Sequence, residues 1–511
     1  RRRAACSPAA ASVAVVAAVV CLGVVAVGDQ LRPTLRRSLT LHAMPRAVVD
    51  AALSAEACVN PMVSSRSFWT GPRPLVVQWE DELRGWELLQ VTDLQRHGDR
   101  WLYRHDIVGN VCWPKQLNSS AQALATECGF DRDSLWQQFP REPDPYSSPA
   151  EGNCDLMQIT LSGLRHARRL GKLLASEYAK GGRHPLKGLA STGCAPGTVS
   201  LASDAVEKNE RTAEEVYTGL CGWAPTLEEF PAESVLLNRT GMGPGTPLWL
   251  LPGVCGGAAL EAYGHEASSA LRESAEWTTE VRSLVEEASA LNGHPVPDKV
   301  ADYRPFLSAL IDCTVCHACL DLDDAPRKLL NDQGLPDGHG LFGRMDRAET
   351  AGVLWPLEYF RARSASDLHR YARLQHGAYF AALGDRMQAA VDSARRGDSW
   401  HDAPEVFIEV MSDTDISPHL FLLGLTEDAA VRPQWLATLI TELWVRGSGA
   451  NASFAVRVLY NGLVRKPCPK QKGCLCPWES FREMLKRLTP EEEECRPFYD
   501  NFQRRSTFRP R

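Results

Sequence analysis

A short basic cluster is the first feature of this sequence that suggests chemistry. Residues 96–100 read Arg-His-Gly-Asp-Arg, so a histidine lies between two arginines where glycine allows a tight turn. Here the imidazole of His97 is able to attack phosphorus while Arg96 and Arg100 grip the equatorial phosphate oxygens in bidentate fashion. The cluster predicts phosphoryl transfer through a phosphohistidine. A basic surface turn is the alternative for these five residues taken alone.

The elements expected to position this cluster are two β-strands. Residues 87–94 are typical of a strand that leads into the turn at His97. Residues 405–411 are typical of another strand and lead into a second polar cluster, Ser-Asp-Thr-Asp, at 412–415. Open α/β sheets bind ligands at the carboxyl ends of their strands, so two clusters distant in sequence are able to meet in one site.

Other segments indicate the fold class. Thr160 is a suitable N-cap for an amphipathic helix through Tyr178, and residues 437–445 and 454–460 are typical of neighbouring strands joined by a Gly-Ser-Gly-Ala turn. We predict an α/β fold with a central mixed sheet flanked by helices on both faces. The core segments are expected at 86–102, 155–222 and 400–465, with a mostly helical cap from approximately 103–154 and 223–395.

Beyond these motifs, the sequence resembles the histidine acid phosphatases, which carry an Arg-His-Gly-x-Arg turn after their first strand. It is most similar to the branch of 2-phosphoxylose phosphatases. The resemblance runs in collinear order over roughly residues 86–500 and includes blocks at 156–160, 211–212, 311–319, 416–418, 423–425, 442–444, 456–462 and 476–481. It implies the histidine phosphatase fold and hydrolysis of a phosphomonoester without a cofactor or metal.

The resemblance also implies a role for each residue of the two clusters. His97 corresponds to the nucleophile, Arg96 and Arg100 to phosphate ligands, and Asp413 to the general acid. Since a carboxylic acid protonates a leaving alkoxide only while it holds its own proton, we expect an acid pH optimum. A helix N-cap is the alternative role of Asp413, and Asp415 is the second choice for the acid.

Three positions depart from the family pattern, and one of them is Leu102, which replaces a proline that stiffens the turn. Ser412 stands where the family has a histidine that contacts phosphate, and we expect Ser412 to line the substrate site as a weaker ligand. The family's third arginine precedes an Arg-Thr pair, but residues 201–210 contain no arginine before Arg211. Ser412 is the chief support for an alternative class of function, a phosphate-binding protein that turns over slowly or not at all.

The expected partner is a phosphorylated small molecule or glycan. By resemblance the favoured substrate is 2-phosphoxylose in the glycosaminoglycan linkage region, with inositol phosphates and other monoesters as alternatives for the same mechanism. The net charge of −7 is modest and mixed along the chain, so nothing indicates binding of nucleic acid.

An uncharged, largely apolar run at residues 9–28 predicts a membrane segment. A transmembrane helix needs about 20 such residues. We favour a signal anchor over a cleaved signal peptide. Residues 1–30 would then form this segment, 31–85 a stem, and 86–511 a lumenal phosphatase domain of a single-pass type II Golgi protein. Secretion or a lysosomal location is the alternative.

Cysteines and sequons agree with the secretory pathway. All but two of the 16 cysteines follow the apolar run, a density that suits disulfides in an oxidising compartment. Sequons for N-glycosylation begin at Asn118, Asn238 and Asn451. The Cys-x-x-Cys-His-x-Cys cluster at 313–319 is interpreted as disulfide cysteines in preference to a zinc site. We expect a glycoprotein with disulfide bonds.

Overall fold

The structure of the chain is a computed structural model. The described residues are 81–100, 158–203, 206–223, 255, 275–292, 296, 365–398, 404–429, 433–468 and 473–496. By its contacts the chain divides into residues 1–54 and 55–511, and every described residue belongs to the second unit. The expected anchor, the expected stem up to residue 80, the sequons at Asn118 and Asn238, and the cysteine cluster at 313–319 lie outside the described residues.

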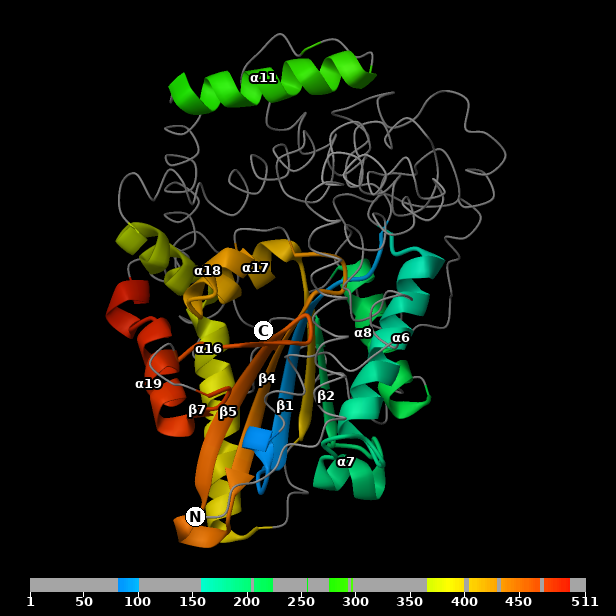
Figure 1. Ribbon diagram of the computed structural model, residues 1–511, viewed down its shortest axis with the longest axis vertical. Coiled ribbons are helices and arrows are strands. Elements are labelled where there is room, and N and C mark those ends of the chain that lie inside the picture. The colour runs from blue at the N-terminus through cyan, green and yellow to red at the C-terminus, as the bar shows by residue number, and fades with distance from the viewer. Residues whose placement is uncertain are drawn as a thin grey trace, which may run out of the picture. The chain divides into compact units, whose positions relative to one another are not determined.

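A seven-stranded mixed sheet forms the centre of the described structure (Figure 1). Its order is β2-β3-β1-β4-β5-β6, and β7 pairs with β5. The strands are β1 (Glu87–Arg96), β2 (Val199–Ser203), β3 (Val406–Met411), β4 (Thr438–Arg446), β5 (Ser453–Tyr460), β6 (Leu463–Arg465) and β7 (Cys476–Pro477). Because β2, β3 and β1 run parallel, their carboxyl ends lie at one edge of the sheet.

The register of the central strands sets the two polar clusters side by side. β1 pairs in parallel with β3, and Arg96 lies opposite Met411. The turn at His97 and the cluster that starts at Ser412 therefore leave the sheet next to each other. On its other side β1 pairs antiparallel with β4, with Val91 opposite Glu442.

Three helices cover one face of the sheet: α6 (Leu161–Tyr178), α7 (Lys187–Thr192) and α8 (Glu207–Cys221). Their apolar residues share a core with Val91 and Ile408 of the sheet. α6 and α8 cross very closely, because a Cβ on Gly171 would lie 2.0 Å from the Val216 oxygen and one on Gly219 would lie 2.1 Å from the Arg168 oxygen. Only glycine permits this approach.

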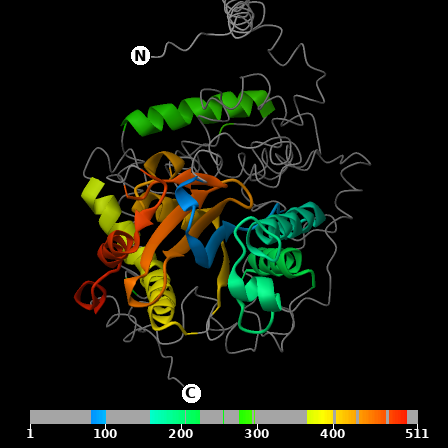
Figure 2. The same ribbon diagram turned by 60° about the horizontal axis from the view of Figure 1, so that its bottom comes forward.

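The other face is covered by α16 (Ala365–Arg396), α17 (Asp413–Leu422), α18 (Thr426–Ala429) and α19 (Trp478–Leu488). Phe380 and Met387 of α16 and Phe481 of α19 are fully buried in a core with Leu94 and Leu443 of the sheet. Figures 1 and 2 show α16 and α19 on the opposite side of the sheet from α6 and α8. The predicted α/β class, a mixed sheet with helices on both faces, is confirmed.

The local predictions agree closely with the observed elements. Thr160 is the N-cap of α6, and its hydroxyl accepts a hydrogen bond of 3.0 Å from Gly163 N. The strands expected at 437–445 and 454–460 are β4 and β5, joined through the short 3-10 helix η7 (Gly449–Asn451). A further 3-10 helix, η1 (Asp81–Leu83), precedes β1.

One helix in the range expected for the cap packs on the central sheet. The range 223–395 includes α16, which packs directly against the sheet and belongs to the α/β core. The apolar residues of α16 recur along a helix of 32 residues. This pattern is the same for a helix of the core and a helix of the cap, so the sequence alone does not distinguish the two. Elsewhere in this range the structure describes α11 (Ala275–Asn292), in keeping with the expected helical character.

Among the described residues no helix has the length and apolarity that a membrane crossing requires.

Three disulfides are present among the described residues. They join Cys194 to Cys221, Cys255 to Cys495, and Cys468 to Cys476. The prediction that this chain uses its cysteines in disulfides is confirmed for these pairs. Cys474, which lies between two bonded cysteines in sequence, is buried and has no disulfide partner in the described part of the chain.

Candidate active site

The turn that follows β1, residues 97–100, is held by both neighbouring strands, and we call it the histidine turn. His97 N donates to Met411 O of β3 at 3.1 Å, and His97 O accepts from Leu436 N at 3.1 Å. Leu436 has a φ of +58°, a left-handed conformation that residues with a Cβ rarely adopt. Such strained backbone tends to occur at functional sites.

The ring of His97 is oriented by its own turn. Nδ1 lies 2.8 Å from Gly98 O. A carbonyl oxygen only accepts hydrogen bonds, so Nδ1 carries the hydrogen and Nε2 keeps its lone pair in the neutral ring. Burial holds the pKa of His97 well below its usual range, and the positive charges of Lys208, Arg96 and Arg100 act in the same direction. The result is a neutral imidazole, which is the nucleophilic form.

Glycine at position 98 allows the histidine turn to lie directly against α6. A Cβ on Gly98 would lie 2.9 Å from Gly163 O in α6 and 3.2 Å from the Ile159 side chain. Gly98 N donates to Thr212 Oγ1 in α8 at 2.9 Å. The histidine turn therefore lies between the first turn of α6 and the second turn of α8.

The structure brings the two predicted clusters together through Arg96 and Asp413. Arg96 Nη2 lies 2.9 Å from Asp413 Oδ2, and Nη1 donates to Pro433 O at 2.6 Å. Both side chains are largely buried, with 6% and 16% of their surface exposed. The N-cap of α17 is Ser412, so the alternative role of Asp413 as the N-cap is wrong.

Asp415, the second choice for the acid, serves the end of α17. Its Oδ2 accepts a hydrogen bond of 3.1 Å from Ser412 N, which is the carboxylate half of a capping box. Ser412 directly follows Met411, whose carbonyl accepts from His97 N, so Ser412 lies beside the histidine turn. Asp413 thus forms an ion pair with Arg96, whereas Asp415 caps the N-terminus of α17.

Arg100 and Asp99 complete the histidine turn and join it to α6. Arg100 is 4% exposed and forms an antiparallel β-bridge with Ile159. Asp99 is 1% exposed, and its Oδ2 lies 2.9 Å from Nδ1 of His166 in α6. Asp99 O accepts from Thr160 N at 2.9 Å.

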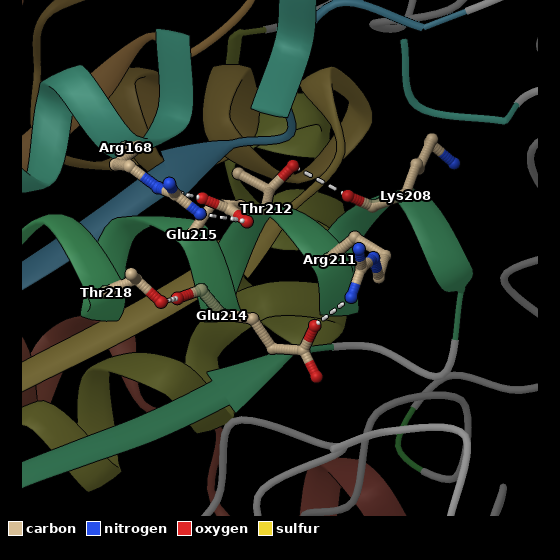
Figure 3. A network of polar contacts seen from close by, with 7 residues as sticks. All are labelled: Arg168, Lys208, Arg211, Thr212, Glu214, Glu215 and Thr218. Atoms are coloured by element: carbon tan, nitrogen blue, oxygen red, sulfur yellow. Dashed lines mark hydrogen bonds and ion pairs between the residues drawn. The ribbon is translucent and has the colours of Figure 1, made fainter. Parts of the chain in front are cut away.

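Lys208 is a residue of this site that sequence reasoning missed. It lies in the first turn of α8 after β2, is 3% exposed, and its charge acts on His97 more strongly than that of either arginine. Thr212, one turn later, accepts from Gly98 N and donates to Lys208 O at 2.6 Å (Figure 3). Residues four apart share a helix face, so the spacing of Lys208 and Thr212 is a signal that could have identified Lys208. Lys208 was missed because only an arginine was expected before the Arg-Thr pair.

Two further features bear on the predicted sites. Asn451, at the end of η7, is exposed, as an acceptor of a glycan must be. Within the described ranges, no three His, Cys, Asp or Glu side chains are placed to hold a metal ion.

Comparisons with known proteins found likeness only among solved structures. No protein-family model and no curated protein matches the sequence. A phytase from Klebsiella sp. ASR1 is 15% identical, with 80% of this chain and 96% of that chain covered and a TM-score of 0.43. A multiple inositol polyphosphate phosphatase from Bifidobacterium longum, in complex with inositol hexasulfate, is 13% identical, with coverage of 85% and 97% and a TM-score of 0.47.

A phytase from D. castellii is 14% identical, with 90% of this chain and 92% of that chain covered and a TM-score of 0.42. At these identities and TM-scores the likeness concerns the fold, and it assigns no activity or substrate to the chain. The chemistry is argued from the chain's own residues.

Proposed function

We propose that this chain hydrolyses phosphomonoesters through a phosphohistidine on His97, in the manner of a histidine acid phosphatase. The observation that carries the proposal is the 2.8 Å contact of Nδ1 with Gly98 O, which leaves Nε2 as the nucleophilic nitrogen. Three buried cations, Arg96, Arg100 and Lys208, act on the same ring and supply the charge that a phosphate dianion requires.

In the first step, His97 Nε2 forms a bond to phosphorus as the bond from phosphorus to the ester oxygen breaks. Asp413, in its protonated form, gives a proton to the leaving oxygen, and the alcohol departs. Arg96 exchanges its contact with Asp413 for the phosphate oxygens. The Nδ1 hydrogen bond to Gly98 O stabilises the positive charge that develops on the ring.

In the second step, water attacks the phosphohistidine. The Asp413 carboxylate takes one proton from that water, the remaining hydroxyl group joins phosphorus, and the electron pair of the nitrogen–phosphorus bond returns to His97 Nε2. Inorganic phosphate leaves, and Asp413 is again protonated for the next turnover. Acid pH favours the form of Asp413 that starts the cycle.

For the substrate we propose 2-phosphoxylose, which rests on the sequence blocks shared with the 2-phosphoxylose phosphatases. Inositol phosphates are the second candidate, because the structural neighbours are named as phytases and an inositol polyphosphate phosphatase. A phosphate-binding protein without turnover is the rival class. Its support is Ser412, which occupies a position beside the histidine turn where the family has histidine.

The proposal is tested with the purified chain and an aryl phosphate, from acid to neutral pH and with a chelator present. His97→Ala is compared with His369→Ala, which changes an exposed histidine of α16 outside the site. We expect hydrolysis with an acid optimum, loss of activity in His97→Ala only, and a base-stable phosphoryl group on the wild-type chain. Binding of inorganic phosphate without turnover would favour the rival class. With 2-phosphoxyloside and inositol hexakisphosphate, relative kcat/KM decides the substrate.

We also propose that the domain lies in the Golgi lumen behind a type II anchor at residues 9–28. The three disulfides and the exposed Asn451 support an oxidising, glycosylating compartment. The test is expression of the full chain in cultured animal cells. We expect Asn451→Gln to remove one glycan-dependent shift in gel mobility, and the chain to stay in the membrane fraction after alkaline carbonate extraction. An unmodified Asn451 would contradict a lumenal domain.

A further inference from the structure

Asp99 places a buried negative charge in the histidine turn, which carries the proposed nucleophile His97. It stands in the histidine turn between Gly98 and Arg100 and is 1% exposed. Water screens a buried charge poorly, so an unpaired carboxylate here would repel an incoming phosphate dianion. The site therefore needs a positively charged neighbour that pairs with Asp99 and does not itself bind phosphate.

His166 supplies that charge. Its Nδ1 lies 2.9 Å from Asp99 Oδ2, and 30% of its side chain is exposed, so it exchanges protons with solvent. Burial lowers the pKa of His166, and Arg165 and Arg169 add to this, but the hydrogen bond and charge of Asp99 outweigh them and raise it overall. The ion pair is thus charged at acid pH.

The charged residues around the Asp99–His166 pair come from the histidine turn, α6 and α8. The histidine turn contributes Asp99, and α6 contributes Arg165 and Arg169. α8, which packs along α6, presents Glu215, and Arg168 binds that carboxylate through two hydrogen bonds of 2.6 and 3.0 Å (Figure 3).

The other contacts between α6 and the histidine turn do not titrate. Thr160 donates to Asp99 O through its N–H at 2.9 Å and its hydroxyl at 3.2 Å. A Cβ on Gly163 would lie 2.3 Å from Asp99 O, so the helix lies directly against the turn. Loss of the proton from His166 therefore changes the charge at the turn and leaves α6 docked.

We propose that His166 is a positioning residue that acts through Asp99: its protonated ring neutralises this carboxylate, so affinity for the phosphomonoester follows the protonation of His166. The inference rests on the proposed phosphatase function and adds a pH control to the same site. Below the pKa of His166 the ion pair is intact and KM is low. As pH rises through that pKa, Asp99 is left uncompensated and KM rises, while kcat is little affected.

The test compares His166→Gln with Arg165→Gln, which removes the same charge from the preceding residue of α6. KM and kcat for an aryl phosphate, and the Kd of inorganic phosphate, are measured from pH 5 to 8.5. We expect His166→Gln to raise KM and the phosphate Kd about fivefold at pH 5, which is the scale of one screened charge contact. The rise of KM with pH should disappear in this variant. Arg165→Gln should keep the wild-type KM at pH 5. Its KM should still rise with pH, at a somewhat higher pH than in the wild type, because Arg165 lowers the pKa of His166.

Asp99→Asn gives a readout that misfolding does not imitate. Without the carboxylate, KM should stay low above the pKa of His166, and the double variant Asp99→Asn/His166→Gln should regain the low KM. The imidazole of His166, followed by NMR, should titrate at a lower pH in Asp99→Asn than in the wild type.

The inference is overturned if His166→Gln has wild-type KM at every pH, or if Arg165→Gln shifts KM equally. If the wild-type enzyme is active, neither of these two results contradicts the proposed phosphatase function. A wild-type chain that neither hydrolyses aryl phosphate nor binds inorganic phosphate would overturn the proposed function and, with it, the role of His166.

Discussion

Arg96 and Asp413 form an ion pair of 2.9 Å between the last residue of β1 and the first residue of α17. Pro433 O fixes the other side of the Arg96 guanidinium at 2.6 Å. The candidate general acid therefore lies against a group that would hold the phosphate. This contact distinguishes Asp413 from Asp415, whose carboxylate binds the end of the same helix.

The first prediction concerns these two carboxylates. Asp413→Asn should lower kcat about 10²- to 10⁴-fold for an alkyl phosphate, the usual contribution of a general acid, and much less for p-nitrophenyl phosphate, whose leaving group needs no proton. Asp415→Ala should keep its activity and lose about 1 kcal/mol of unfolding free energy through the weaker helix cap. The reverse pattern would make Asp415 the acid.

Lys208 should contribute to phosphate affinity. Lys208→Met removes a charge that acts on His97, so KM should rise about tenfold, the scale of one charge-assisted hydrogen bond. The pKa of His97 should also rise, because Lys208 holds it down. Lys208→Arg should retain most of the affinity. Arg168→Gln, on an exposed part of α6, is the matched loss of charge. Equal KM in Lys208→Met and wild type would remove Lys208 from the site.

The hydroxyl of Thr212 should stabilise the histidine turn. Thr212→Val leaves the buried Gly98 N–H without its acceptor, at a cost of about 1–3 kcal/mol. Thr218→Val is the control, because the Thr218 hydroxyl donates to Glu214 O of the same helix, at 2.7 Å (Figure 3), and not to the histidine turn. Urea unfolding of both variants measures the difference. Thr212→Ser should resemble the wild type, and equal losses at 212 and 218 would count against a tie between α8 and the turn.

Buried histidines should make the fold less stable in acid. Burial lowers the pKa of His419 to about 4, against 6.5 for an exposed ring, and His419 contacts His376 in an edge-to-face arrangement at 5.1 Å. As pH falls from about 6.5 to 4, the unfolded chain binds a proton that the folded chain does not, so the free energy of unfolding falls. For His419 alone the loss is roughly 3 kcal/mol.

Urea unfolding at pH 7.5 and pH 4.5 tests this for the wild type and His419→Gln. The variant should be less stable at pH 7.5, because buried packing is altered, and should lose less stability between the two pH values. Carboxylates such as Glu442, whose pKa is lowered by Arg457 despite its burial, act on both proteins alike. An identical pH dependence would show that His419 is protonated in the fold.

Local patterns predicted much of the fold. The residue types at 87–94 predicted β1, Thr160 predicted the start of α6, and the glycine-containing link after 445 predicted the pair β4 and β5. Each of these depends on interactions within a few residues, which sequence displays directly. The packing of α16 on the sheet could not be predicted in this way, because a helical period does not show which surface the helix covers.

The sequence by itself determined the histidine turn, the strands that precede both polar clusters, and the residue types available for phosphoryl transfer. Only the tertiary structure decided which of them meet. It set Asp413 on Arg96, brought Lys208 to His97, paired Asp99 with His166, and joined Cys255 to Cys495 across 240 residues. The physical reason is that contacts between distant segments follow from strand register and helix packing, which depend on the whole core and leave no local periodicity to read.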